Sequence, residues 1–99
     1  MVRHIVLFQF IESLTPQAKD EVYNRFKRGI EALPEQIPFI RHIYVGRNVN
    51  PAETWDICLN GDFDTLEDVV AYGQHPLHLA VSGELKPYLK GRSCVDYEY

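Results

Sequence analysis

The sequence predicts a single α+β domain over residues 1–99, and three observations support this prediction. First, residues 2–11 alternate as a β-strand does, with large apolar side chains at both odd and even positions. Second, two later stretches repeat apolar residues at helical spacing after residues that cap helices. Third, a chain of 99 residues has the size of one compact domain, and 45% of its residues are apolar.

The first predicted strand has apolar side chains on both of its faces. One face holds His4, Val6, Phe8 and Phe10. The other face holds Arg3, Ile5, Leu7, Gln9 and Ile11. A strand with two apolar faces is expected to be covered on both sides.

The first predicted helix begins at Thr15, a favourable N-cap, with Pro16 at the first helical position. One apolar stripe at helical spacing consists of Ala18, Val22, Phe26, Ile30 and Leu33. Pro34 ends the helix. Two further strands are predicted at residues 39–49 and 54–63, with a turn at residues 50–53. Trp55, Ile57, Leu59 and Phe63 are expected to share one face of the third strand.

The last third of the chain predicts a broken helix and then a strand. Thr65 caps a short helix that runs to about Gln74, and Pro76 interrupts it. A further helical stretch covers residues 77–89, and its apolar stripe consists of Leu77, Val81, Leu85 and Tyr88. Residues 92–99 form the last strand. The order is therefore β-α-β-β-α-β, the ferredoxin-like arrangement. Its right-handed crossovers give a four-stranded antiparallel sheet of order 4-1-3-2, with the helices on one face.

The open face of this sheet predicts a homodimer. If the face of the first strand that carries His4 points to the helices, Ile5 and Leu7 lie on the uncovered face. Four strands of about eight residues make a face of roughly 500 Å², which is near the largest apolar patch that a monomer exposes. Pairing two such faces buries roughly 1,000 Å² in total, enough for a specific interface. The alternative is a monomer with a patchy open face.

Composition and charge exclude several classes of partner. The net charge is −4 without a basic stripe, so we expect no binding to nucleic acid or to a membrane surface. No apolar stretch approaches the roughly 20 residues that cross a bilayer, and we expect a cytoplasmic protein. Cys58 and Cys94 lie two strand spacings apart in the predicted sheet, about 10 Å, and are expected to be free thiols. No Cys/His spacing predicts a metal site.

Four histidines are the first candidates for chemistry, because imidazole transfers protons near neutral pH. His42 lies alone on a strand and is expected to be structural. Tyr72, His75 and His78 lie together at the helix break, where one interpretation is an acid–base pocket. The alternative is that His75 caps the following helix and that His78 lies at the edge of its apolar stripe.

Motifs along nearly the whole chain resemble one known family. They are the opening His4-Ile5-Val6-Leu7-Phe8, the region Val45-Gly46-Arg47-Asn48, Phe63, Tyr72, the motif His75-Pro76-Leu77-His78, and the closing Val95-Asp96-Tyr97. These motifs resemble the stress-responsive A/B barrel (Dabb) family, and the HPxH element is fairly specific. The resemblance implies a dimeric α+β barrel.

One branch of that family, represented by the olivetolic acid cyclase of plants, closes a linear polyketide by an intramolecular aldol step without a cofactor. The resemblance implies that His78 is the general base and that Tyr72 orients or stabilises the substrate oxygen. It also matches His4 to a histidine of that branch's first strand. Ile57 stands where the branch has a further pocket histidine, so the same substrate is not expected.

Two functions are compatible with these features. The first is a cofactor-free enzyme that performs aldol, cyclase or isomerase chemistry on a carbonyl or polyketide-like compound. Its catalytic residues would be His78 and Tyr72, and its substrate-binding residues His4, His75, Phe8 and Val81. The alternative is a non-catalytic stress-responsive or ligand-binding dimer in which the histidines are structural. A third function, that of a cofactor-independent monooxygenase, rests on fold analogy alone.

Overall fold

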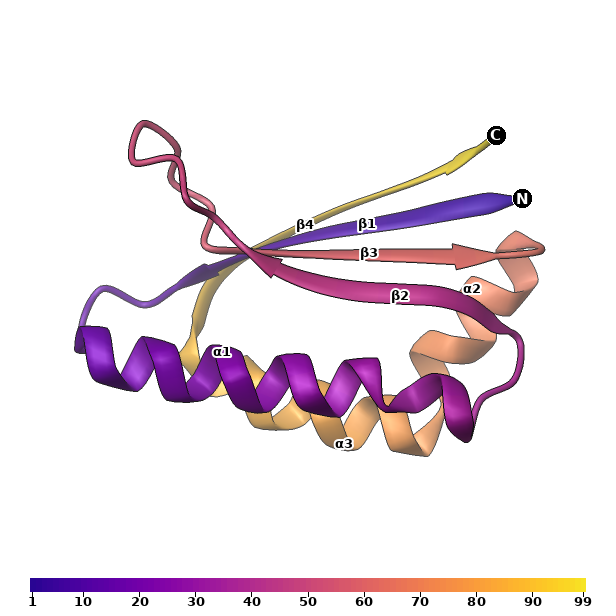
Figure 1. Cartoon of the computed structure of the whole chain (residues 1–99), viewed down its shortest axis with the longest axis horizontal. Helices are drawn as coiled ribbons and strands as arrows, with labels where there is room; N and C mark the ends of the chain where they lie inside the picture. Colours follow the sequence, from indigo (N-terminus) through magenta and orange to yellow (C-terminus); the bar gives the residue numbers. More distant parts are fainter.

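The computed structural model describes residues 1–99 and contains the predicted order of strands and helices. The strands are β1 (Val2–Phe10), β2 (Ile40–Arg47), β3 (Ile57–Phe63) and β4 (Leu89–Glu98). The helices are α1 (Pro16–Glu31), α2 (Leu66–Gln74) and α3 (Pro76–Leu85), with short 3₁₀ turns η1 (Leu33–Glu35) and η2 (Lys86–Tyr88). Figure 1 shows the sheet as one layer with all three helices on the same side of it.

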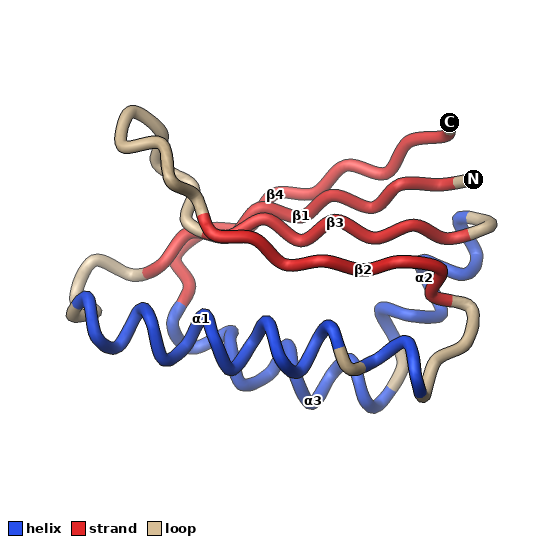
Figure 2. The backbone as a smooth tube through the Cα atoms, viewed as in Figure 1, coloured by secondary structure: helices blue, strands red, loops and turns tan.

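The sheet confirms the predicted topology. Its strand order is β2-β3-β1-β4, and every neighbouring pair is antiparallel. β1 therefore lies between β3 and the C-terminal strand, and His4 stands opposite Gly61 on one side and Asp96 on the other. Figure 2 shows the loop between β2 and β3 projecting away from the helices.

The alternation of β1 separates its two faces as predicted. The even-numbered side chains from Val2 to Phe10 are buried beneath the helices, and the odd-numbered ones are half-buried on the open face. His4 is therefore on the helix side, and only 7% of it is exposed. This placement brings its imidazole to the same side of the sheet as the helix break.

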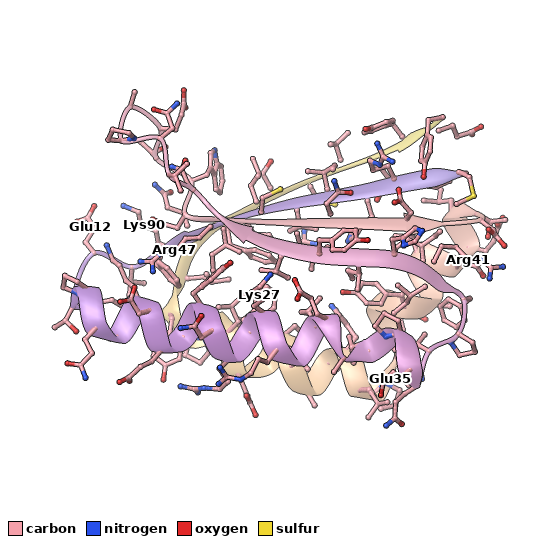
Figure 3. All side chains as sticks on the ribbon, viewed as in Figure 1. Glu12, Lys27, Glu35, Arg41, Arg47 and Lys90 are labelled. Atoms are coloured by element: carbon pink, nitrogen blue, oxygen red, sulfur yellow. The ribbon has the colours of Figure 1, made fainter.

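α1 packs against the sheet mainly at β2. The Thr15 hydroxyl accepts a hydrogen bond from the backbone N–H of Ala18, which caps the helix as predicted. Val22, Phe26 and Ile30 form its buried stripe. Figure 3 shows Lys27 pointing from α1 towards the sheet, where its ammonium donates hydrogen bonds to Glu31 and to the Val45 carbonyl.

α3 packs on α1 and α2 rather than directly on the sheet. A β-carbon added to Gly29 of α1 would lie 2.9 Å from Cγ1 of Val81, so glycine permits this close approach. α3 ends at Leu85, earlier than predicted, because Pro87 has no backbone N–H to continue the helical hydrogen bonds. Leu77, predicted to lie in the apolar stripe, is exposed because no element faces the first turn on that side.

The face of the sheet away from the helices has no cover within the chain (Figure 1). Its centre is formed by half-buried Ile5 and Leu7 of β1 and exposed Val95 and Tyr97 of β4. Trp55 was predicted to share a face of the third strand with Ile57, Leu59 and Phe63. It lies instead before β3 and borders a shallow depression that it shares with Leu7 and Cys58. None of the helices combines the length and apolarity that crossing a membrane needs.

Candidate functional site

A cavity of about 660 Å³ lies between the sheet and the face of α3 that looks towards it. β1 and β3 contribute one apolar wall, and α2 and α3 contribute the other. The apolar lining residues are Val6, Phe8, Phe26, Leu59, Val69, Leu79, Leu85 and Leu89. His4, Tyr72 and His78 line the same cavity, so the structure brings three of the predicted site residues together.

His78 lies in the first turn of α3, and its tautomer follows from one hydrogen bond. Its Nδ1 lies 3.0 Å from the carbonyl oxygen of Gly73. A carbonyl can only accept, so Nδ1 carries the proton and Nε2 holds the lone pair of the neutral ring. Burial lowers the pKa of His78, and the coulombic effects of His4 and Arg92 lower it further. The hydrogen bond to Gly73 acts in the opposite direction, but the pKa is lowered on balance. His78 is therefore a neutral base at neutral pH.

Tyr72 lies in the last turn of α2, and its hydroxyl is a buried donor without a partner. Only 1% of the residue is exposed, and burial raises the pKa of its phenol well above the ordinary value. Its ring centre is 4.4 Å from that of His78 and 6.1 Å from that of His4. A buried hydroxyl that makes no hydrogen bond costs about 1–3 kcal/mol, and a ligand oxygen in the cavity would remove this cost.

His4 completes the polar end of the cavity together with a residue from the last strand. Its Nδ1 lies 2.5 Å from Oδ1 of Asp96, which stands opposite it in the β1–β4 pairing. The ionised carboxylate accepts this hydrogen bond, so Nδ1 is the donor and the carboxylate fixes the ring. Asp96 belongs to the closing motif Val95-Asp96-Tyr97, but the sequence alone predicted no role for it. The antiparallel register of β1 and β4 was the signal that would have placed it beside His4.

The other predicted site residues divide between the cavity and its surroundings. Phe8 lines the apolar wall of the cavity. His75 and Val81 were predicted to contact the ligand, but they lie outside the cavity. The His75 ring accepts a hydrogen bond from the backbone N–H of Leu77 through Nδ1, so it caps α3. Val81 is turned towards Gly29, because the side of α3 that carries it packs on α1.

Comparison with known proteins identifies the family. The family model of the stress-responsive A/B barrel domain (Dabb) matches residues 2–99. The chain belongs to this family. A comparison with curated protein sequences finds no match.

Solved structures similar to this Dabb chain share its fold. A protein from Bacteroides fragilis, described as dimeric, ferredoxin-like and of unknown function, is 48% identical with a TM-score of 0.96, over 99% of this chain and 95% of that one. A dimeric ferredoxin-like protein of unknown function from Thermobifida fusca is 26% identical with a TM-score of 0.81, over 99% and 90%. A hydroxynitrile lyase from Passiflora edulis is 19% identical with a TM-score of 0.73, over 97% and 90%, which shows a common fold alone.

One group of side chains in the Dabb chain has potential metal ligands close together. The ligand atoms of His4, Cys94 and Asp96 lie within 4.8 Å of one another. However, the Nδ1 of His4 is already engaged by Asp96. Burial also raises the pKa of the Cys94 thiol, with the Asp96 charge adding to the effect, which disfavours the thiolate that binds metals. The arrangement favours a histidine–aspartate hydrogen bond over metal coordination.

Proposed function

We propose that this Dabb protein binds a small carbonyl or polyketide-like compound in the cavity and catalyses a proton transfer on it, as a cofactor-free enzyme. One observation carries the proposal. The partnerless hydroxyl of Tyr72 and the neutral imidazole of His78 lie side by side on the wall of the same cavity. A hydrogen-bond donor for an oxygen and a base for a nearby proton are the two groups that enolisation requires.

The roles of the two residues follow from their protonation states. Nε2 of His78 removes a proton from the carbon next to the substrate carbonyl, and the electron pair moves onto the carbonyl oxygen. Tyr72 donates a hydrogen bond to the enolate oxygen that forms. In an isomerisation the imidazolium returns the proton to a second carbon. In an aldol closure the enolate carbon attacks another carbonyl of the same molecule, and the imidazolium protonates the alkoxide that results.

The proposed assembly is a homodimer formed through the open face of the sheet. The dimeric description of the Bacteroides fragilis protein supports it, because that protein is 48% identical over nearly the whole chain. The apolar centre of the open face at Ile5, Leu7, Val95 and Tyr97 supports it independently. Each subunit keeps its own cavity, because the cavity lies on the opposite side of the sheet.

A screen of β-polyketo compounds and related small carbonyl compounds tests the proposal. We expect at least one compound to be turned over, and to shift the NMR resonances of the Tyr72 and His78 rings when it binds. The non-catalytic alternative uses the same cavity, and it predicts the ring shifts without turnover. If no compound in a broad screen shifts these resonances, the cavity is not a ligand site and the proposal fails.

The pH dependence of turnover is expected to have its midpoint below the ordinary histidine pKa of 6.5. A base must be neutral to accept a proton, and burial lowers the pKa of His78 from its ordinary value of 6.5. The neutral form is therefore lost only as the pH falls below that value, and kcat/KM decreases there. Tyr72 must stay protonated, and its raised pKa keeps it so through neutral and mildly alkaline pH. A midpoint above the ordinary histidine value in a kcat/KM profile would contradict this assignment.

Replacing Tyr72 by phenylalanine is expected to separate function from stability. The ring packing is kept and a buried unpaired hydroxyl is removed, so the free energy of unfolding should rise by about 1 kcal/mol. Turnover should fall by about 10²-fold, because one donor to the enolate oxygen is lost. Denaturant titration and kinetics measure the two effects. Tyr88→Phe is the matched control, because Tyr88 packs against the core without lining the cavity. A destabilised Tyr72→Phe protein would indicate that the hydroxyl has a structural partner.

A further inference from the structure

The lysine and arginine side chains that border the cavity are positively charged, and no acidic side chain borders it. Lys86 and Arg92 line it, and no aspartate or glutamate does, although the chain as a whole has a net charge of −4. Neither cation takes part in a salt bridge, whereas Arg3, Lys27, Arg41, Arg47 and Lys90 each have a carboxylate partner. The border of the cavity therefore holds two cations that have no carboxylate partner within the chain.

The two cations border the cavity from consecutive elements of the chain. Lys86 follows the last residue of α3, and Arg92 lies six residues later on β4, beyond the turn η2. Arg92 stands opposite Phe8 in the β1–β4 register, so its side chain leaves the sheet on the cavity side. After burial, its charge is one of the smaller causes that lower the pKa of His78.

The acidic residue that shares this side of β4 forms no salt bridge with Arg92. Asp96 shares a face of β4 with Arg92, but its carboxylate accepts the hydrogen bond from His4. Apart from His4, Tyr72, His78 and Ser82, the rest of the cavity wall has no polar side chain and includes Phe8, Phe26 and Leu89. A ligand that matches this lining has an apolar body and one negative group.

We infer that the ligand class of this cavity is an apolar molecule that carries one carboxylate, with the carboxylate held by Arg92 and Lys86. The inference rests on the proposed function, and it specifies the substrate of the same site. The guanidinium binds a carboxylate through two parallel hydrogen bonds, and the ammonium adds a second positive charge. The two cations are the residues that determine specificity, while Tyr72 and His78 act on the carbonyl of the bound molecule.

Three probes with the same apolar body and different charge test this inference. Octanoate, octanamide and octylammonium are titrated into the protein, and binding is measured by calorimetry and by the shifts of the Tyr72 and His78 resonances. We expect octanoate to bind about tenfold more tightly than octanamide, because two partly exposed ionic contacts contribute together. Octylammonium should bind most weakly, and the preference for octanoate should shrink as salt is added.

Variants then assign the preference to particular residues. Arg92→Gln should remove most of the difference between octanoate and octanamide, and the double variant with Lys86→Gln should remove all of it. Lys90→Gln is the matched control, because Lys90 lies on the same strand, outside the cavity, and is paired with Glu12 (Figure 3). It should keep the wild-type preference.

The outcomes separate this inference from the proposed function. Equal binding of octanoate and octanamide overturns the carboxylate inference and leaves an uncharged carbonyl substrate possible for the site. An equal effect of Lys90→Gln and Arg92→Gln also overturns it, because overall charge then explains the preference. If none of the three probes binds, the inference is wrong, whereas the turnover of uncharged carbonyl compounds still decides the proposed function separately.

Discussion

Replacing His78 by alanine is expected to lower turnover by about 10²–10⁴-fold, the usual contribution of a general base. The effect should fall on kcat, because the imidazole acts on the proton during the reaction and contributes little to holding the substrate. The fold should survive, since the ring is only half-buried and its one hydrogen bond, to the Gly73 carbonyl, is worth about 1 kcal/mol. Steady-state kinetics on a compound from the substrate screen measures the loss.

Two further variants show whether the loss comes from the base itself. His78→Gln retains an amide that can donate to the Gly73 carbonyl but offers no basic nitrogen, so it should be as inactive as His78→Ala. His75→Ala is the matched control, because His75 caps α3 outside the cavity. It should lose about 1 kcal/mol of stability and keep its activity. Wild-type turnover by His78→Ala would refute the assignment of the base.

Replacing Leu7 by aspartate is expected to abolish the homodimer and to cause aggregation. Leu7 lies on the open face and is half-buried even in the single chain, so a partner face would enclose it. An unpaired charge buried in an interface costs about 3–5 kcal/mol, which is a change of more than a hundredfold in the dissociation constant. Separated subunits then expose the apolar face, which favours aggregation.

Light scattering at micromolar concentration tests the dimer and the variant together. The wild type should have twice the mass of the chain, and Leu7→Asp should give monomer and aggregates. Val70→Asp is the control, because Val70 is an exposed apolar residue on α2, on the other side of the sheet. It should remain dimeric. A wild-type protein with the mass of a monomer would show that the open face has no partner copy.

The element order was predictable because its signals are local. Thr15 and Thr65 cap their helices as expected, and the alternation of β1 correctly separates the two faces of the sheet. The errors arise where a signal depends on distant residues. Trp55 continues the alternation of the third strand in sequence, but β3 begins only at Ile57, so the alternation does not extend to it.

The candidate site was predictable to the extent that it depends on the strand pattern and the helix break. The alternation of β1 put His4 on one face with Val6, Phe8 and Phe10, and Pro76 places Tyr72 and His78 on either side of one break. Whether Val81 faces the cavity or α1 depends on how α3 is rotated about its axis. The close contact between Val81 and Gly29 of α1 fixes that rotation. The apolar periodicity of α3 alone carries no information about a contact with another helix.

The way α3 packs also affects how this protein can evolve. α3 is held by its contacts with α1 and α2, and its inner face, at Leu79, Ser82 and Gly83, borders the cavity without belonging to the buried core. A β-carbon added to Gly83 would meet no atom within 4 Å. Substitutions at such positions cost about 0.5 kcal/mol or less, so a lineage can change the shape of its cavity with little loss of stability. One scaffold can thus diverge among ligands while the residues that fold it stay the same.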